Sequence, residues 1–291
     1  MLFIGSIPAT CVLIARRDIP ESPRCHMKRG EVKDAVKIIC KTIYHLPGAL
    51  NKCFDTYKSV RSSPDTKREN HTHKAGSYAF LFRKDMRRRT ILVTIPWFLM
   101  DVVFYGIGLF TPILLAAMAF EGDGLNFIAD DILATEGTAF LDIFLIIGFI
   151  LNIILIERVG RMRLQILGFA GMALGLALLI IGSLHGASMV FILFTGFACY
   201  NLLMNLGPNA TTFILPAELF PTDMRATVHG FAAGIAKLGA AIGIILVPLL
   251  KEQFGIPVTL TVMLVLVLIA LLVTIHFRIE TAGRSLEDIT E

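Results

Sequence analysis

The sequence predicts an all-α protein that lies in a membrane. Of its 291 residues, 55% are hydrophobic and 17% are charged, and the mean hydropathy is +0.71. A bilayer core about 30 Å thick requires about 20 predominantly apolar residues per helix. Six stretches meet or approach that length, namely 90–118, 138–156, 164–184, 188–214, 228–250 and 256–277. We therefore expect six complete membrane-spanning helices in a multi-pass integral membrane protein.

The first apolar segment, residues 1–15, is too short to span a bilayer comfortably. It differs from a signal peptide, because no basic residue precedes the apolar run and Arg16 and Arg17 follow it. We interpret this segment as the end of a transmembrane helix whose beginning lies outside the sequence.

The distribution of charge predicts the orientation of the spans. Of the 27 Lys and Arg residues, 19 lie between Arg16 and Arg89, whereas residues 119–137 contain none and carry five acidic residues. Basic loops mark the cytoplasmic side of a membrane. We therefore place two segments outside, 119–137 and 185–187, and four inside: 16–89, 157–163, 215–227 and the tail after Phe277. The alternation closes for six spans, so a nucleic-acid partner is not needed to explain the net charge of +4.

Three further parts follow the initial segment. Residues 16–89 form a polar cytoplasmic linker, in which Arg29–Tyr44 places Val32, Ala35, Val36 and Ile39 at helical spacing and predicts a short amphipathic helix. Residues 90–278 form the bundle of six spans, and residues 279–291 form a cytoplasmic tail.

Ionisable side chains are rare inside the predicted spans, and Asp101 and Lys237 are two of them. A charge at the bilayer centre costs at least ~2.5 to 3.5 kcal/mol, so such residues usually serve a function. Trp97, Asp101 and Tyr105 follow one another at intervals of four residues and share one helix face. That face offers an indole donor, a carboxylate and a phenol.

This set of groups suits a protonated oxyanion. A carboxylate only accepts hydrogen bonds, so Asp101 can receive the hydroxyl of dihydrogen phosphate but would repel sulfate. Lys237 can supply the counter-charge, and Asn209, which follows the helix-breaking pair Gly207 and Pro208, can add an amide donor. Asp101 would then bind substrate, a proton or both. The alternative is that Asp101 and Lys237 only neutralise one another and join two helices.

A second group of charges lies at the predicted cytoplasmic surface. Glu157 with Arg161, and Glu218 with Arg225, are spaced for salt bridges that break and re-form as the helix ends move. Exposed pairs contribute only ~0 to 1 kcal/mol each, which suits a gate. The same pattern is also typical of ordinary charged loops, so the spacing leaves both interpretations open.

Enzymatic and metal-binding functions receive little support from the sequence. It contains no nucleophile elbow, P-loop or paired metal-ligand motif. His71 and His73 have no third ligand nearby in the sequence. We expect no enzyme activity, no metal site and no cofactor.

Several motifs resemble a known transporter family. "IPESPR" (19–24), "ERVGRMR" (157–163) and "ETAGRSLEDI" (280–289) resemble sugar-porter motifs of the major facilitator superfamily, where they follow the sixth helix, join the eighth and ninth, and follow the twelfth. "WFLMDVVFYG" (97–106), "GPNATTFILPAELFP" (207–221) and "RATVHGFAAGIAKLGAAIG" (225–243) resemble the phosphate:proton symporters within that superfamily.

The resemblance implies the fold of the C-terminal six-helix half, preceded by the end of the sixth helix and a cytoplasmic helical linker. It implies a phosphate site in which Trp97, Asp101, Tyr105 and Asn209 contact the anion and Lys237 lies near it. It also implies alternating access driven by a proton gradient. The helices of the first half are absent, so the expected partners are inorganic phosphate, protons, the lipid bilayer, and a missing N-terminal half or a full-length relative.

Two other functions remain open. One is a sugar or organic-ion porter of the same superfamily, although the QQ-x-x-G-x-N and GP-x-x-W patterns typical of sugar porters are missing. The other is a non-transporting membrane subunit or fragment that pairs with a full-length transporter. A plasma membrane and a bacterial inner membrane fit the sequence equally well.

Overall fold

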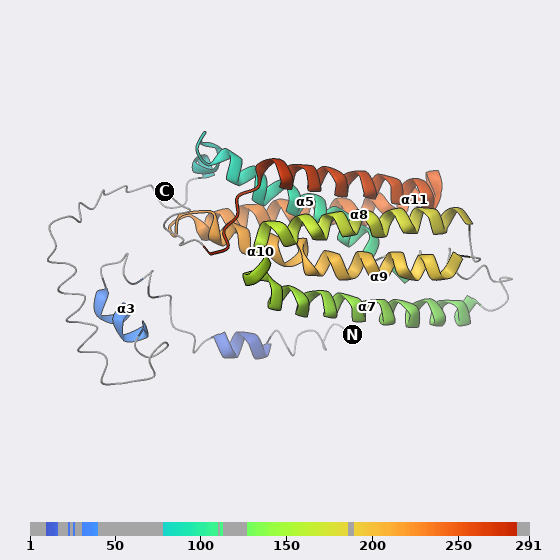
Figure 1. Cartoon of the computed structure of the whole chain (residues 1–291), viewed down its shortest axis with the longest axis horizontal. Helices are drawn as coiled ribbons and strands as arrows, with labels where there is room; N and C mark the ends of the chain where they lie inside the picture. The colour runs from blue at the N-terminus through green and yellow to red at the C-terminus, as the bar shows by residue number, and fades with distance from the viewer. Residues whose placement is uncertain are drawn as a thin grey trace. The chain divides into compact units, whose positions relative to one another are not determined.

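The computed structural model describes residues 10–16, 23, 26, 31–39, 78–109, 111–112, 127–185 and 189–283. The chain divides into two units, Met1–His73 and Lys74–Glu291, which we describe separately. All regular elements of the described residues are helices (Figure 1). The prediction of an all-α fold is therefore confirmed.

The first unit contains the helix α3, Val32–Ile39, within the range for which the sequence predicts an amphipathic helix. Ala35 and Val36 are buried, and Lys33, Asp34 and Lys37 are exposed, so the helix has an apolar and a polar side. Residues 10–16 are also helical. Residues 1–9 and 40–77, which include His71 and His73, lie outside the described residues.

The second unit is a bundle whose helices run side by side (Figure 1). A short 3-10 helix, η2 (Tyr78–Phe82), precedes the bundle. The helices of the bundle are α5 Arg87–Gly108, α7 Phe127–Val159, α8 Arg161–His185, α9 Val190–Leu206, α10 Pro208–Glu218 and α11 Arg225–Phe277. Five helices of the described chain are long and apolar enough to cross a membrane, with α9 and α10 counted as one and α11 counted once.

The six predicted spans and these five helices agree because α11 doubles back. Gly255 has φ 80° and ψ 173°, a backbone conformation that favours glycine. Near one end of α11, the Phe231 ring lies 6.1 Å from the Phe82 ring, and near the other end the carbonyl of His276 accepts a hydrogen bond of 3.3 Å from Arg88. Both ends of α11 therefore lie near the start of α5. We call residues 225–254 the first arm and residues 256–277 the second arm.

The first arm packs closely against α5. A Cβ atom at Gly239 would lie 2.5 Å from the carbonyl oxygen of Phe98, and one at Gly243 would lie 2.1 Å from that of Val102. Contacts that advance by four residues on both helices show that the two run in the same direction. Small residues at such a seam let two backbones approach closely. The seam fixes the first arm, and with it Lys237, beside α5.

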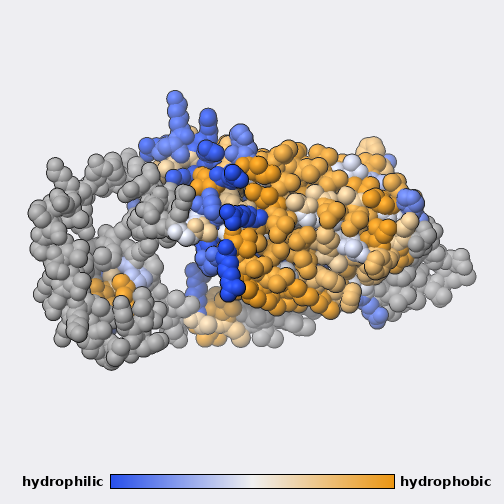
Figure 2. Space-filling model, viewed as in Figure 1, coloured by the Kyte–Doolittle hydropathy of each residue, from blue (hydrophilic) through white to orange (hydrophobic). Residues whose placement is uncertain are grey.

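Apolar side chains cover the outside of the bundle. On α7, Ile146, Ile150 and Ile153 are 57%, 51% and 64% exposed. Figure 2 shows hydrophobic residues over the visible side of the bundle and hydrophilic residues gathered at one end. An apolar exterior of this extent is typical of a surface that faces lipid.

Within the second unit, helix ends that adjoin predicted cytoplasmic segments lie close together. Arg89, at the start of α5, donates a hydrogen bond of 3.0 Å to the carbonyl of Leu219, which follows α10. Arg161, at the start of α8, pairs with Glu218 at the end of α10. The alternation of ends agrees with the predicted topology, while the side of the membrane to which each end belongs stays a prediction.

Candidate functional site

The candidate site is centred on an ion pair between α5 and the first arm of α11. Lys237 Nζ lies 3.0 Å from Asp101 Oδ2 and donates a second hydrogen bond of 3.0 Å to the Tyr105 hydroxyl. The ammonium also lies 4.6 Å from the centroid of the Tyr105 ring. The structure therefore places two of the predicted residues, Asp101 and Tyr105, against the ammonium of a third, Lys237.

The two partners of the ion pair differ strongly in exposure. The Asp101 side chain is 3% exposed, whereas the Lys237 side chain is 55% exposed. The Asp101 carboxylate is therefore stabilised by the protein groups around it. The exposed side of Lys237, more than half of its side chain, is not covered by other described residues.

Trp97 lies one turn before Asp101 on α5, and its side chain is completely buried. The indole N–H lies near the Asp101 carboxyl but forms no hydrogen bond of acceptable geometry among the described residues. An unsatisfied buried donor costs about 1 to 3 kcal/mol, so such a group in a native structure requires an explanation. A ligand that accepts this hydrogen bond would remove the cost.

Two aromatic side chains that were not predicted as site residues hold the Trp97 ring. The ring centroid of Phe213 on α10 lies 4.6 Å from that of Trp97, and that of His229 on the first arm lies 5.5 Å away. Phe213 follows Asn209 by four residues and His229 precedes Lys237 by eight, so helical spacing from these candidates could have indicated both.

Asn209 lies on the same helix as Phe213, but the hydrogen bond that the structure shows for its amide goes to Asn205 and not to another predicted site residue. The helix is interrupted at Gly207, between α9 and α10. Across this interruption, the Asn209 amide donates a hydrogen bond of 2.7 Å to the side chain of Asn205. Asn209 shares a helix face with Phe213, which contacts Trp97. Since the end of α10 lies near the start of α5, the turn of α10 that carries Asn209 lies further along α5, toward Asp101.

A buried hydrogen-bonded chain fixes α10 in this position. Thr211 donates a bond of 2.9 Å to Gln165 Oε1 on α8, and Gln165 Nε2 donates one of 3.2 Å to Thr274 on the second arm. All three side chains are completely buried. Because each of the three side chains has a hydrogen-bond partner, this series of hydrogen bonds joins three helices without the cost of an unpaired polar group.

Three of the four predicted gate residues form a network centred on Arg161. Its guanidinium binds Glu157 at 2.6 and 2.9 Å and Glu218 at 2.9 and 3.1 Å. Arg225 instead donates a hydrogen bond of 3.0 Å to the carbonyl of Phe220. The ion pair that the structure shows for Glu218 therefore joins it to Arg161, a residue far away in the sequence, and differs from the expected pair with Arg225.

The segment after α11 extends this network. Glu280 accepts a hydrogen bond of 3.0 Å from the backbone N–H of Arg161, and Thr281 donates its hydroxyl to Glu218. Gly160 has φ 100°, and a Cβ there would lie 2.8 Å from the Glu280 carboxylate. Glu280 was not predicted as a gate residue, although an acid directly after the last span, within the quoted motif, was a usable signal.

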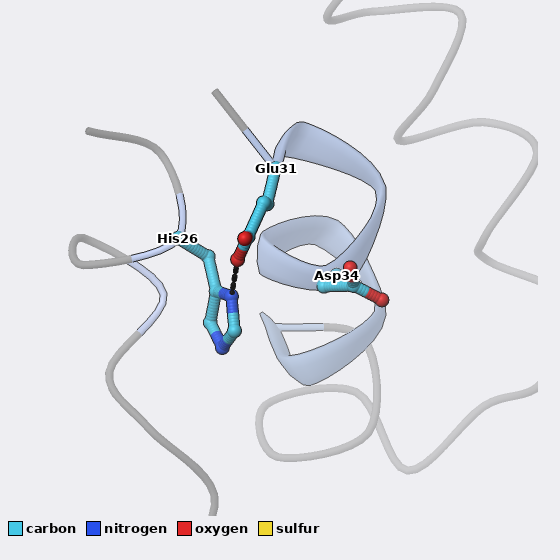
Figure 3. A group of neighbouring side chains, drawn as sticks. All are labelled: His26, Glu31 and Asp34. Carbon is cyan, nitrogen blue, oxygen red and sulfur yellow. Dashed lines mark hydrogen bonds and ion pairs between the residues drawn. The ribbon is translucent and has the colours of Figure 1, made fainter. Parts of the chain in front are cut away.

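A separate polar group lies in the first unit, where His26, Glu31 and Asp34 place ligand atoms within 4.8 Å of one another. Figure 3 shows the Glu31 carboxylate directed at the His26 imidazole, with an O–N distance of 2.7 Å. We interpret the group as a hydrogen-bonded pair beside α3, with Asp34 in the first helical turn, where a negative charge is favourable.

Comparison with known proteins places the chain among transporters. The sequence model of the family described as "Sugar (and other) transporter" matches residues 1–291. The "Probable inorganic phosphate transporter 1-6" of Arabidopsis thaliana is 26% identical over 100% of this chain and 55% of its own length. The "Repressible high-affinity phosphate permease" of Neurospora crassa is 27% identical over 82% of this chain and 42% of its own length.

Solved structures support the same fold. A structure of XylE, described as a proton:xylose symporter of the major facilitator superfamily, matches 97% of this chain and 56% of its own chain with a TM-score of 0.69 and 20% identity. The chain thus spans about half the length of these relatives. The architecture is that of one half of a major facilitator superfamily protein, and the chain belongs to the sugar (and other) transporter family.

Proposed function

We propose that this chain supplies the C-terminal half of a proton-coupled inorganic phosphate transporter. The observation that carries the proposal is the buried carboxylate of Asp101, paired with the half-exposed Lys237. Beside it lies the N–H of Trp97, which has no hydrogen bond of acceptable geometry among the residues that the structure describes. The phosphate transporters among the relatives support this substrate.

Dihydrogen phosphate matches the groups of the site one by one. Its negative charge suits Lys237, and its oxygens can accept hydrogen bonds from Trp97 and Tyr105. Its hydroxyl can donate to Asp101, which sulfate cannot do. Charge-assisted hydrogen bonds of this kind are stronger than neutral ones. The anion therefore binds by taking over part of the contact between Lys237 and Asp101.

Proton coupling follows from the same carboxyl group. A proton on Asp101 would weaken its pairing with Lys237 and leave the ammonium available to the anion. Loading of the proton and of phosphate then favour one another. In alternating access, two six-helix halves rock around a site at the middle of the membrane. The remaining contacts would come from an N-terminal half, whether in the same polypeptide or in a full-length relative.

The network around Arg161 would act as the cytoplasmic gate. Glu157, Arg161 and Glu218 join three helix ends in the arrangement that the structure shows. Opening toward the cytoplasm requires these ends to separate, so the pairs would break and re-form during each cycle. Arg225 would fix the turn between α10 and α11 through its bond to Phe220.

Uptake of labelled phosphate into proteoliposomes with an imposed proton gradient tests the proposal. We expect Asp101→Asn to abolish gradient-driven uptake, whereas Asp142→Asn, which changes an exposed acid on α7, should leave it largely intact. Arsenate should compete with phosphate, and sulfate and glucose should not. Uptake that survives unchanged in Asp101→Asn would contradict the assignment, and competition by glucose would favour a sugar porter.

The size of the polypeptide in its source membranes decides how the test is assembled. A product near twice the calculated 32.0 kDa calls for uptake assays on that longer protein. A product near 32.0 kDa calls for purification together with any transporter that binds it. Stable association without any effect on uptake would favour the non-transporting subunit.

A further inference from the structure

We propose that His229 is a positioning residue, which acts through Trp97 to hold the indole donor of the phosphate site in place. The inference rests on the proposed function for its substrate, and on three ring contacts for its geometry. Trp97 lies 5.5 Å from His229 and 4.6 Å from Phe213, and the latter two rings lie 6.2 Å apart.

The three rings form a closed group contributed by three different segments of the bundle. Trp97 belongs to α5, Phe213 to α10 and His229 to the first arm of α11. The planes of Trp97 and His229 meet at 66°, an edge-to-face arrangement that aromatic rings prefer. An indole held on two sides has little freedom to rotate, so its N–H keeps one direction.

A fixed direction matters because the Trp97 N–H forms no hydrogen bond of acceptable geometry within the described helices. A donor held by a hydrogen bond needs no further support, but this donor is buried and unpaired among the described residues. Its orientation is therefore set largely by the packing of the ring against Phe213 and His229. A ligand that meets a donor already in position loses less entropy on binding than one that must order it.

His229 also links this donor to the cation of the site. It lies eight residues before Lys237 on the same arm, so the two side chains emerge about 80° apart around the helix. From neighbouring positions around the first arm, His229 thus contacts Trp97 and Lys237 contacts Asp101.

Trp97 fluorescence can report on this arrangement, because Trp97 is the only tryptophan in the sequence. We would compare wild type, His229→Ala and His229→Phe in lipid nanodiscs, using acrylamide quenching and emission anisotropy without phosphate. His276→Ala is the matched control, because His276 is also a histidine on α11 that contacts an aromatic ring, Phe277, at 4.7 Å. Circular dichroism would verify that each variant retains its helices.

We expect His229→Ala to increase acrylamide quenching and to lower the anisotropy of Trp97. Phosphate titrated against the same emission should bind about 2- to 10-fold more weakly, the range of a lost aromatic pair. His229→Phe keeps a ring against the indole and should restore both readouts, and His276→Ala should change neither. Sulfate should produce no response in any of the proteins.

Two results would overturn the inference. One is a His229→Ala protein whose quenching and phosphate affinity equal those of wild type. The other is a His229→Phe protein as defective as His229→Ala, which would show that ring packing is not the cause. Failure of the proposed function gives a different result, because the wild-type emission would then ignore phosphate while acrylamide quenching still decided whether His229 holds Trp97.

Discussion

Removing the two partners of the central ion pair should have unequal effects on stability. Lys237→Met leaves the Asp101 carboxylate, 3% exposed, without the cation that solvates it. Breaking a buried pair in this way destabilises a protein by about 3 to 5 kcal/mol. Asp101→Asn leaves an ammonium on a side chain that is 55% exposed and still donates a hydrogen bond to the Tyr105 hydroxyl, so the loss should be smaller.

The loss in Lys237→Met has a ceiling, because the carboxyl can take up a proton instead of remaining charged. Protonating an aspartate of ordinary pKa, about 3.9, requires about 4 kcal/mol at pH 7 and about 1.5 kcal/mol at pH 5. The destabilisation should therefore be about 3 to 4 kcal/mol at pH 7 and shrink to about 1.5 kcal/mol at pH 5. The double variant of Asp101→Asn and Lys237→Met should resemble Asp101→Asn at both pH values.

The free energy of unfolding can be measured for the purified chain in mixed micelles by titration with a denaturing detergent, with far-ultraviolet circular dichroism as the signal. The two single variants and the double variant form a thermodynamic cycle that isolates the pairing of Asp101 with Lys237. Equal losses in the two single variants, or a loss in Lys237→Met that does not change between pH 7 and pH 5, would refute the reasoning.

Three glycine substitutions test the packing around Lys237 and around Arg161. Gly243→Ala should lower the free energy of unfolding by about 1 to 3 kcal/mol, because its Cβ would lie 2.1 Å from the Val102 carbonyl. Gly234→Ala, in open space on the same arm, should raise the free energy of unfolding by up to about 1 kcal/mol. Equal effects of the two substitutions would contradict the close packing of the first arm against α5. Gly160→Ala should lower the free energy of unfolding by about 1 to 3 kcal/mol, because φ at this position is 100° and the added Cβ would meet the Glu280 carboxylate. In the same unfolding assay, a smaller loss when Glu280→Ala is added would identify the part of the loss that comes from this steric contact.

The sequence predicts the helices well because apolar length and charge alternation are local properties. Their bounds are less exact. The predicted stretch 90–118 overlaps α5, which begins at Arg87 and ends at Gly108, and the stretch 188–214 includes a break at Gly207 between α9 and α10. Hydropathy does not register a break whose flanking residues are equally apolar, and Pro208 fits the first turn of the helix that follows.

The site could be predicted only as far as helical spacing reaches. The shared face of Trp97, Asp101 and Tyr105 follows from intervals of four residues, and the charge of Lys237 indicated a partner for Asp101. Contacts between separate helices depend on tertiary packing, which spacing does not contain. For this reason spacing did not predict the ion pair that the structure shows between Glu218 and Arg161.

The distribution of strong contacts indicates where the bundle can change shape. The glycine seam holds the first arm of α11 to α5, and these two segments carry Asp101 and Lys237. A different set of contacts, through Gln165 and Arg161, holds α10 to α8. The contact between Phe213 and Trp97 joins the two sets at the site without a hydrogen bond or an ion pair. A movement of α10 relative to α5 therefore alters the surroundings of the indole at lower cost than it alters the ion pair. Under the proposed function, Trp97 is thus the side chain best placed to couple phosphate binding to the position of α10.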